Sequence, residues 1–175
     1  MEPTRRMPKR RKAPWRNRED DVVDQATFQQ VYGSFCRCAA SKKFYEDFYK
    51  AFFNSSTEVR AKFKNTDMKR QMQALDKSLG LMVMFAAEQN SIARQALLRV
   101  AELHNSDHHD IHPRLYDLWL ESLMKTVEKH DKTFNNELDR QWRKVLAVGI
   151  DFFRHTYYFG PPGKHSNVEK SEPMP

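Results

Sequence analysis

Apolar residues recur along most of this chain at helical spacing, and this regularity constrains the fold more than any other feature of the sequence. Tyr45, Phe48, Tyr49 and Phe52 stand at positions i, i+3, i+4 and i+7, which places their aromatic rings on one face of a helix. No stretch of strand length alternates apolar and polar residues, and no internal repeat is present. The sequence therefore predicts an all-α protein.

Turn and capping residues divide this pattern into a series of expected helices. Their approximate ranges are 27–38, 42–53, 55–63, 67–87, 91–104, 113–130 and 133–159. Thr27 and Gln30 have the spacing of a capping box, Asp67 suits an N-cap, and Pro113 suits the first turn of a helix. Gly160 and the prolines that follow it are expected to end the last helix.

The positive charge of the chain is concentrated at its start. The whole sequence has a formal net charge of +7 at pH 7, and residues 1–18 alone hold eight Lys or Arg and one Glu, which also gives +7. We expect residues 1–20 to form a disordered basic tail, 21–160 to form one domain, and 161–175 to form a disordered C-terminal tail. The basic tail could contact nucleic acid or an anionic membrane, or it could only aid solubility.

The sequence predicts a soluble protein of the cytoplasm. No segment has the roughly 18 consecutive apolar residues that a transmembrane segment needs, and the start of the chain lacks the apolar region of a signal peptide. The only cysteines, Cys36 and Cys38, point to different sides of a helix, a spacing that suits neither a disulfide framework nor a redox motif. Two ordinary thiols are what a reducing compartment would maintain.

One histidine ends an apolar helical segment. Residues 91–104 carry a helical run of apolar side chains, namely Ile92, Leu97, Leu98, Val100, Ala101 and Leu103. Residues 105–107 then break the pattern, so His104 lies on the apolar side of a helix in its last turn. An imidazole in this position can bind a metal ion, and it can equally be a core histidine that bonds to a carbonyl.

Several of the expected helices also carry side chains that suit a haem pocket. Haem is a flat apolar disc whose iron takes one axial histidine, while its opposite face needs either a gap or a hydrogen-bond donor. Tyr49, Phe63 and His104 come from three separate segments, and Gln71 and Leu75 lie one turn apart on a fourth. An axial ligand, aromatic walls and two donors are therefore available.

Four segments, in this order, resemble the haem-binding globin family, in particular its bacterial single-domain or flavohaemoglobin-like members. They are FYKAFFNSSTEVRAKF (48–63), KRQMQALDKSL (69–79), LHNSDHHDIHPRLYDLW (103–119) and LDRQWRKVLAVGIDFF (138–153). The third holds a proximal histidine followed by an Ile-x-Pro-x-x-Tyr signature, and the fourth has Trp142 in the usual place. The similarity runs from about Thr27 to Tyr158, and it implies a globin fold of about seven or eight helices around a haem pocket.

The resemblance also implies a role for each matching residue. His104 would be the axial ligand of the iron in haem b, and Phe63 would stack on the porphyrin. Tyr49 and Gln71 would form a distal hydrogen-bonding pair, and Leu75 would shape the cavity. The other pocket residues implied in this way are Phe48, Ile111 and Tyr116. The ligands would be dioxygen and other diatomic gases such as nitric oxide and carbon monoxide.

Three features depart from the flavohaemoglobin pattern. The loop between His104 and Ile111 looks about two residues longer. This region also adds His108, His109 and His112, and one of these could be the iron ligand in place of His104. Tyr157 aligns near a glutamate that strengthens the proximal histidine in that group. No flavin or nicotinamide reductase domain is present in the sequence, so any turnover would need an external electron donor.

Three functions follow from the resemblance, and one rival does not depend on it. The protein could bind dioxygen reversibly, it could convert nitric oxide to nitrate as a dioxygenase with an external reductase, or it could sense a gas and signal through a partner. The rival is a non-haem zinc or iron site built from the histidines and aspartates of one region, which are His104, Asp107, His108, His109, Asp110 and His112.

Overall fold

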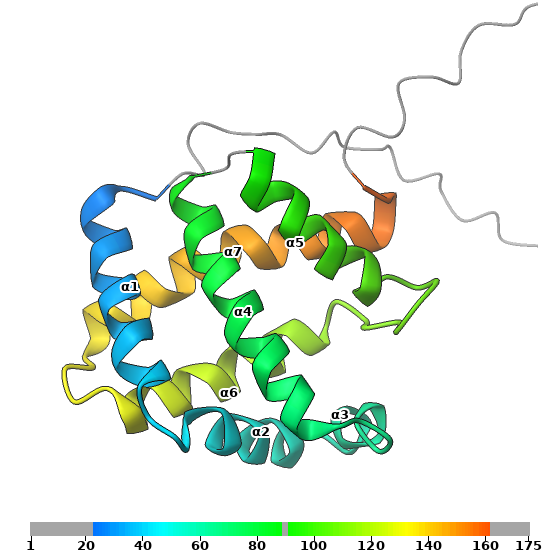
Figure 1. Cartoon of the computed structure of the whole chain (residues 1–175), viewed down its shortest axis with the longest axis horizontal. Coiled ribbons are helices and arrows are strands. Elements are labelled where there is room, and N and C mark those ends of the chain that lie inside the picture. The colour runs from blue at the N-terminus through cyan, green and yellow to red at the C-terminus, as the bar shows by residue number, and fades with distance from the viewer. Residues whose placement is uncertain (1–22, 89–90, 162–175) are drawn as a thin grey trace, which may run out of the picture.

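The computed structural model describes residues 23–88 and 91–161, and these residues form seven helices (Figure 1). The helices are α1 (Gln25–Ala39), α2 (Phe44–Ser55), α3 (Thr57–Lys62), α4 (Met68–Ala87), α5 (Ser91–His104), α6 (Leu115–His130) and α7 (Asn136–Phe159). The described residues contain no strand, so the all-α prediction is confirmed. All seven helices fall within the predicted domain 21–160, whereas the predicted tails 1–20 and 161–175 lie outside the described residues except for Pro161. Across the two described ranges, no helix is both long and apolar enough to cross a membrane.

Helices that are distant in sequence cross one another and build the core. Figure 1 shows α4 passing in front of α7 at a steep angle, with α1 beside α4. α2 packs on α6, and both α4 and α5 pack on α7. Gly149 of α7 lies where α4 crosses, because a Cβ atom at that position would stand 2.8 Å from Met82 Cε and 3.1 Å from Met82 Cγ. The missing side chain therefore permits the close approach of these two helices.

Aromatic rings fill much of the space between the crossing helices. Trp142, Phe44, Phe48, Phe85 and Phe152 are fully buried, and the rings of Phe85 on α4 and Phe152 on α7 lie 5.4 Å apart. The predicted aromatic face of α2 is the face that the fold buries. Burying one large apolar side chain contributes about 1.5–3 kcal/mol, so this face anchors α2 against the rest of the fold.

α1 and α7 begin at residues other than those predicted. The carboxylate of Asp24 caps α1 by accepting hydrogen bonds from the Thr27 amide and from the Thr27 hydroxyl, both at 2.8 Å. The predicted capping box at Thr27 is therefore wrong, and α1 begins at Gln25. α7 begins after Asn135, whose side chain accepts from two amides of the first turn. In both cases the start is set by a side chain that satisfies the free amides of the first turn.

The α6 start and the apolar face of α5 also differ from the predictions. Pro113 lies in the turn before α6, which begins at Leu115. On α5, Ala101 and Leu97 are buried, but Ile92 is 80% exposed and Leu103 is 50% exposed. The expected apolar face of this helix was therefore too wide, because α5 contacts the rest of the fold mainly through α4 and α7.

A buried polar network joins α1 to the corner between α6 and α7. The Asp131 carboxylate accepts a hydrogen bond from the Ser34 hydroxyl at 2.6 Å and two from the Arg37 guanidinium at 2.8 and 2.9 Å. The Trp142 indole donates to the Ser34 hydroxyl oxygen at 2.9 Å. Burial by itself would raise the pKa of Asp131, but hydrogen bonds from Arg37, Ser34 and Thr133 outweigh it and hold the pKa well below its ordinary value.

Asp131→Asn is expected to lower the free energy of unfolding by about 1–3 kcal/mol at pH 7. The neutral amide forms weaker hydrogen bonds with Arg37, and its NH₂ group faces donors where the carboxylate oxygen accepted hydrogen bonds. The carboxylate has a lower pKa in the folded than in the unfolded chain, so its contribution is present above about pH 4 and is lost as the pH falls. The difference between the two proteins should therefore shrink between pH 7 and pH 3 in urea unfolding. Asp151→Asn, at an exposed position, should cost less than about 0.5 kcal/mol. Equal losses in both variants would contradict the stabilising role of the Asp131 carboxylate.

Candidate functional site

A cavity of about 340 Å³ lies between the helices, and every helix except α1 contributes to its wall. Seven of the eight predicted site residues line it, namely Tyr49, Phe63, Gln71, Leu75, His104, Ile111 and Tyr116. The rest of the wall is mainly apolar and includes Phe52, Val59, Met82, Val100, Leu115, Trp119, Ile150 and Phe153. Residues that are far apart in the sequence therefore meet around one space large enough for a small ligand or part of a larger one.

Phe48 is the predicted site residue that does not line the cavity. Its side chain is fully buried behind the wall, where its ring stacks on Phe52 at 5.5 Å and meets Trp119 edge to face at 6.1 Å. Phe52 and Trp119 both line the cavity, so Phe48 supports two wall residues from behind. This agrees with a packing role and assigns Phe48 no direct contact with a ligand.

His104 is the last residue of α5, and its imidazole faces the cavity. Its Nδ1 atom lies 3.3 Å from the hydroxyl oxygen of Tyr116 on α6. Burial, and to a smaller extent the nearby His109, lowers the pKa of His104 to about 4, so the imidazole is neutral at pH 7. Within the described ranges, no protein atom hydrogen-bonds to Nε2. Because Tyr116 engages Nδ1, Nε2 is the nitrogen left to bind a metal ion.

Phe153, and not Tyr157, lies beside the His104–Tyr116 pair. The Phe153 ring centroid is 5.5 Å from that of His104 and 5.7 Å from that of Tyr116. Tyr157 lies one turn further along α7 and donates its hydroxyl to the carboxylate of Asp110 at 2.7 Å. The predicted alignment of Tyr157 with the proximal pair is therefore wrong by one turn, and the side chain in that place is apolar.

The loop after His104 is tied to α3 by the side chain of Lys62. Lys62 Nζ donates to the carbonyl oxygens of His109 at 3.2 Å and of Asp110 at 2.7 Å. Asp110 has a φ of 47°, a left-handed conformation that aspartate tolerates better than most residues. Both Lys62 and His109 line the cavity, so this link closes one edge of it. In the sequence Lys62 resembles any surface lysine, and no local signal marks it.

The other loop histidines do not assemble into a metal site. His108 pairs through Nδ1 with the Asn105 side chain at 2.9 Å, and the Nδ1 atom of His112 accepts from the Arg114 amide at 3.3 Å. No group of three or more His, Cys, Asp or Glu side chains in the described part of the chain has an arrangement that could hold a metal ion. The predicted rival, a non-haem site in this loop, is therefore not formed by these residues.

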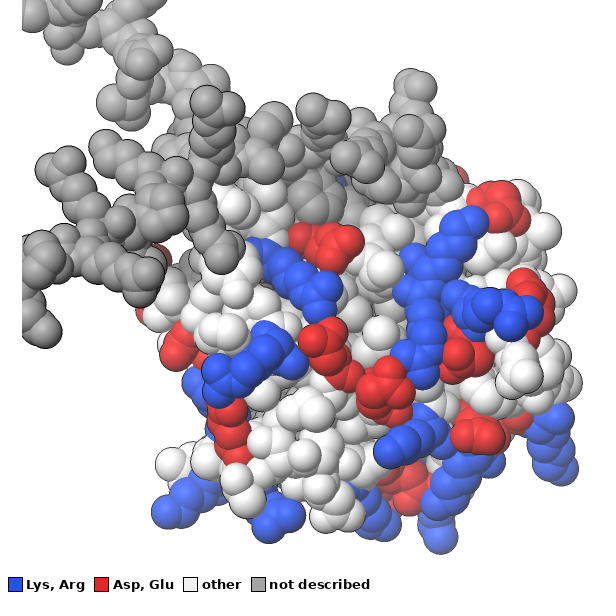
Figure 2. Space-filling view, turned by 180° about the vertical axis from the view of Figure 1, so that it is seen from behind, with Lys and Arg blue, Asp and Glu red and all other residues white. Residues whose placement is uncertain are grey.

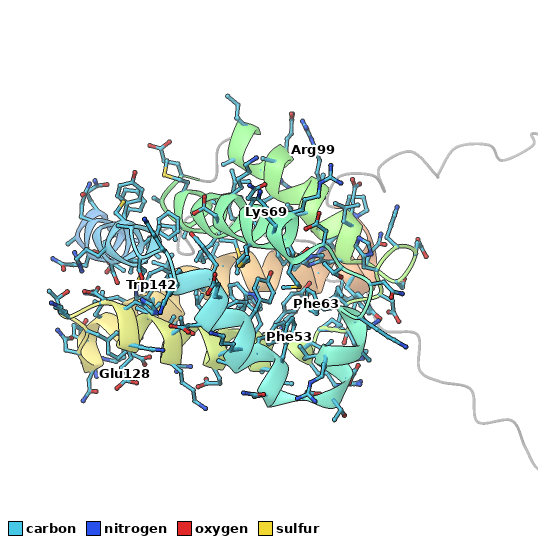
Figure 3. The ribbon with its side chains drawn as sticks, turned by 60° about the horizontal axis from the view of Figure 1, so that its bottom comes forward. Phe53, Phe63, Lys69, Arg99, Glu128 and Trp142 are labelled. Carbon is cyan, nitrogen blue, oxygen red and sulfur yellow. The ribbon has the colours of Figure 1, made fainter. Side chains whose placement is uncertain are left out.

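The side of the cavity formed by α2 and α4 carries two polar groups. Burial raises the pKa of the Tyr49 phenol to about 12, and contact with the Gln71 side chain opposes this shift. The phenol is therefore protonated at pH 7 and retains its O–H donor. The rings of Phe53 and Phe63 pack against it with centroids at 5.6 and 5.7 Å, and Figure 3 shows Phe63 directed toward the interior. Tyr49 is thus held in one orientation at the cavity wall.

The protein without a cavity ligand should lose stability as the pH falls from about 6.5 to about 4. In this range the unfolded chain protonates the His104 imidazole, whereas the folded chain does so only near pH 4. The expected loss is at most about 3 kcal/mol, reduced by the partial solvent exposure of the ring. Urea unfolding at pH 7, 5.5 and 4 measures it. His104→Gln should reduce the dependence of stability on pH, and His112→Gln should not. Parallel pH profiles for His104→Gln and the unsubstituted protein would show that His104 is not the cause of the loss.

Known proteins are similar to this chain in sequence and in fold. The Globin family model matches residues 46–152. The crystal structure of a protein from Pseudomonas aeruginosa PAO1, described as structurally highly homologous to a human haemoglobin, aligns with a TM-score of 0.71 and 36% sequence identity. The alignment covers 75% of this chain and 98% of that chain. No protein of curated function matches the chain significantly.

Proposed function

Since this chain belongs to the globin family, we propose that it holds haem b in the cavity beside His104 and binds dioxygen there reversibly. Membership of the family implies a haem cofactor and diatomic gas ligands. The finer assignment is supported by one observation: a neutral imidazole with an unpaired nitrogen and a protonated phenol line the same cavity. When bound, haem supplies an iron atom that takes an imidazole on one side and a gas molecule on the other.

The residues that line the cavity fit a haem. Most of the wall is apolar and aromatic, which suits the flat face of a porphyrin. The polar residues Lys62 and His109 lie together at one edge, because Lys62 donates to the His109 carbonyl oxygen. A ligand with an apolar body and a charged edge is therefore accommodated by this distribution of side chains.

The proximal side favours reversible binding over peroxidase-like chemistry. Nε2 of His104 would hold the iron, and Nδ1 then carries the proton and donates toward the Tyr116 hydroxyl oxygen. A carboxylate acceptor in this place would make the histidine a stronger electron donor, but the adjoining side chain is the apolar Phe153. A neutral hydroxyl at 3.3 Å is a weak acceptor, so the imidazole keeps an ordinary donor strength.

The distal side supplies the selectivity among gases. Dioxygen gains partial negative charge in such a site, and an O–H donor in a poorly hydrated cavity stabilises it. Tyr49 is the donor in this proposal, and Gln71, in contact with the phenol, orients it or donates beside it. Carbon monoxide gains less charge and benefits less. High affinity for dioxygen with slow release follows.

Nitric-oxide dioxygenase activity is the second candidate, and the same Tyr49–Gln71 pair favours it, because a slowly released dioxygen is available to react with nitric oxide. This activity needs an external electron donor after each turnover. The proposal includes a cytoplasmic location, which suits the two free cysteines, Cys36 and Cys38.

Absorption spectra of the purified protein test the proposal directly. Ferric, ferrous and carbon-monoxide forms should show the bands of a histidine-ligated haem, and oxygen equilibrium measurements should show reversible binding. Nitrate formation in stopped-flow mixing with nitric oxide separates the second candidate from the first. A protein that remains colourless and takes up no haemin would refute both.

A further inference from the structure

The corner between α3 and α4 carries a dense positive charge. Residues 60–70 (RAKFKNTDMKR) contain five Lys or Arg and one Asp, a formal charge of +4 within a short segment. The sum over the chain outside its basic start is zero, so the composition conceals this concentration. All five are exposed, and Lys62 bonds to the loop after His104. We call the other four the basic corner: Arg60, Lys64, Lys69 and Arg70.

The four charges of the basic corner lie close together in the chain and are not neutralised by ion pairs. None of its four side chains forms an ion pair with another described residue, whereas Arg37, Arg114, Arg143 and Arg154 each pair with a carboxylate. Figure 2 shows Lys and Arg interspersed with Asp and Glu over the face seen from behind. An uncompensated patch attracts an anionic partner more strongly than such a mixed surface does.

The basic corner lies at the edge of the cavity. Phe63, Thr66 and Gln71 line the cavity and alternate in sequence with the four basic residues. Consecutive Cα atoms are about 3.8 Å apart, and the backbones of Lys64 and Arg70 directly adjoin wall residues. The side chains of Lys64 and Arg70 therefore begin next to the cavity wall. Figure 3 labels both Phe63, which lines the cavity, and Lys69, which lies in the first turn of α4.

We propose that the basic corner docks an acidic one-electron redox protein that reduces the haem iron. This inference rests on the proposed function, because reversible binding of dioxygen and the turnover of nitric oxide both need ferrous iron. One electron passes from an iron–sulfur cluster of the partner, which is oxidised, to the ferric iron, which becomes ferrous, and no bond forms between the proteins. Electron transfer needs a short path, and a partner on the basic corner stands beside the cavity edge.

An acidic protein fits the basic corner better than a nucleic acid or a membrane does. Among the described residues, the exposed large apolar side chains are Tyr32, Met84, Ile92, Leu103 and Tyr158, and none belongs to residues 60–70. Base stacking and membrane insertion both need such side chains. The charges also follow a bend between two helices, where a compact acidic patch fits more closely than a long polyanion.

The test measures how fast an acidic [2Fe–2S] ferredoxin reduces the ferric haem protein in stopped flow. In the double variant Lys64→Glu/Lys69→Glu we expect the second-order rate constant to fall at least about 10-fold at low ionic strength, and by less than about 2-fold at 0.5 M salt, because salt screens the attraction. The remote double variant Lys125→Glu/Lys132→Glu makes the same change in net charge on exposed lysines of the α6 region and should retain a rate within about 2-fold.

Direct binding supplies a second readout that does not depend on reduction. The dissociation constant for ferredoxin, measured by titration with haem-loaded and haem-free protein, should rise about 10-fold in the first variant and stay unchanged in the second. Equal rates and affinities in both variants would overturn the proposal. The proposal would also be overturned if the first variant alone lost binding to duplex DNA or to phosphatidylserine vesicles while its reduction by ferredoxin was unaffected. A chain that binds ferredoxin through the basic corner but takes up no haemin would instead refute the proposed function.

Discussion

His104→Ala is expected to abolish the retention of haem. Nε2 of His104 is the nitrogen that the Tyr116 contact leaves for a metal, and the neutral state of the ring at pH 7 keeps its lone pair available. Losing an outer-shell partner of a ligand typically costs 10–100-fold in affinity, so losing the ligand itself should cost at least about 100-fold. Titration of the purified variant with haemin, followed by its absorption band, measures this loss.

Matched variants separate loss of the ligand from loss of the fold. His109→Ala, at the other histidine that lines the cavity, should keep haem with at most a small change in affinity. His104→Ala should keep its far-ultraviolet circular dichroism, and free imidazole should restore part of the haem binding by filling the space. If His104→Ala retained haem and His109→Ala lost it, His109 would be the iron ligand and the role proposed for His104 would be wrong.

Tyr49→Phe should speed the dissociation of dioxygen by an order of magnitude or more. A hydrogen bond to a charged acceptor contributes about 1.5–3 kcal/mol, and each 1.4 kcal/mol corresponds to a factor of about 10 in rate. The ring should stay in place, because Phe53 and Phe63 pack against the ring itself, and the substitution leaves the ring unchanged. Stopped-flow displacement of dioxygen by carbon monoxide measures the rate, and the carbon-monoxide dissociation rate should change much less.

Tyr45→Phe is the control for this experiment, because it also removes a phenolic hydroxyl from α2. The Tyr45 phenol donates to the Asp76 carboxylate and is not part of the cavity wall. Its removal should leave the dioxygen dissociation rate within about 2-fold, although the loss of one hydrogen bond should cost about 1 kcal/mol of stability. An unchanged rate in Tyr49→Phe, or an equal acceleration in both variants, would remove the donor role from Tyr49.

The sequence by itself determined the helices and the sides of them that carry the site. Spacing of three and four residues puts Tyr49 on the buried side of α2, and it puts Gln71 and Leu75 on one side of α4, whatever the neighbours are. His104 was found in the same way, as the last residue of a helical run before a break. These features depend on contacts within one turn, so they can be read along the chain.

Only the tertiary structure decided which turn of one helix meets which turn of another. Phe153 and Tyr157 share a face of α7, so helical spacing alone favours neither as the neighbour of His104, and the alignment chose Tyr157 wrongly. The choice depends on where α5 and α6 cross α7, as does the burial of Leu97 in place of Ile92. Lys62 likewise became part of the cavity edge only when the loop after His104 folded back on it. Helical periodicity fixes direction around an axis, but the packing of whole helices fixes position along it, and that packing depends on side chains far apart in the sequence.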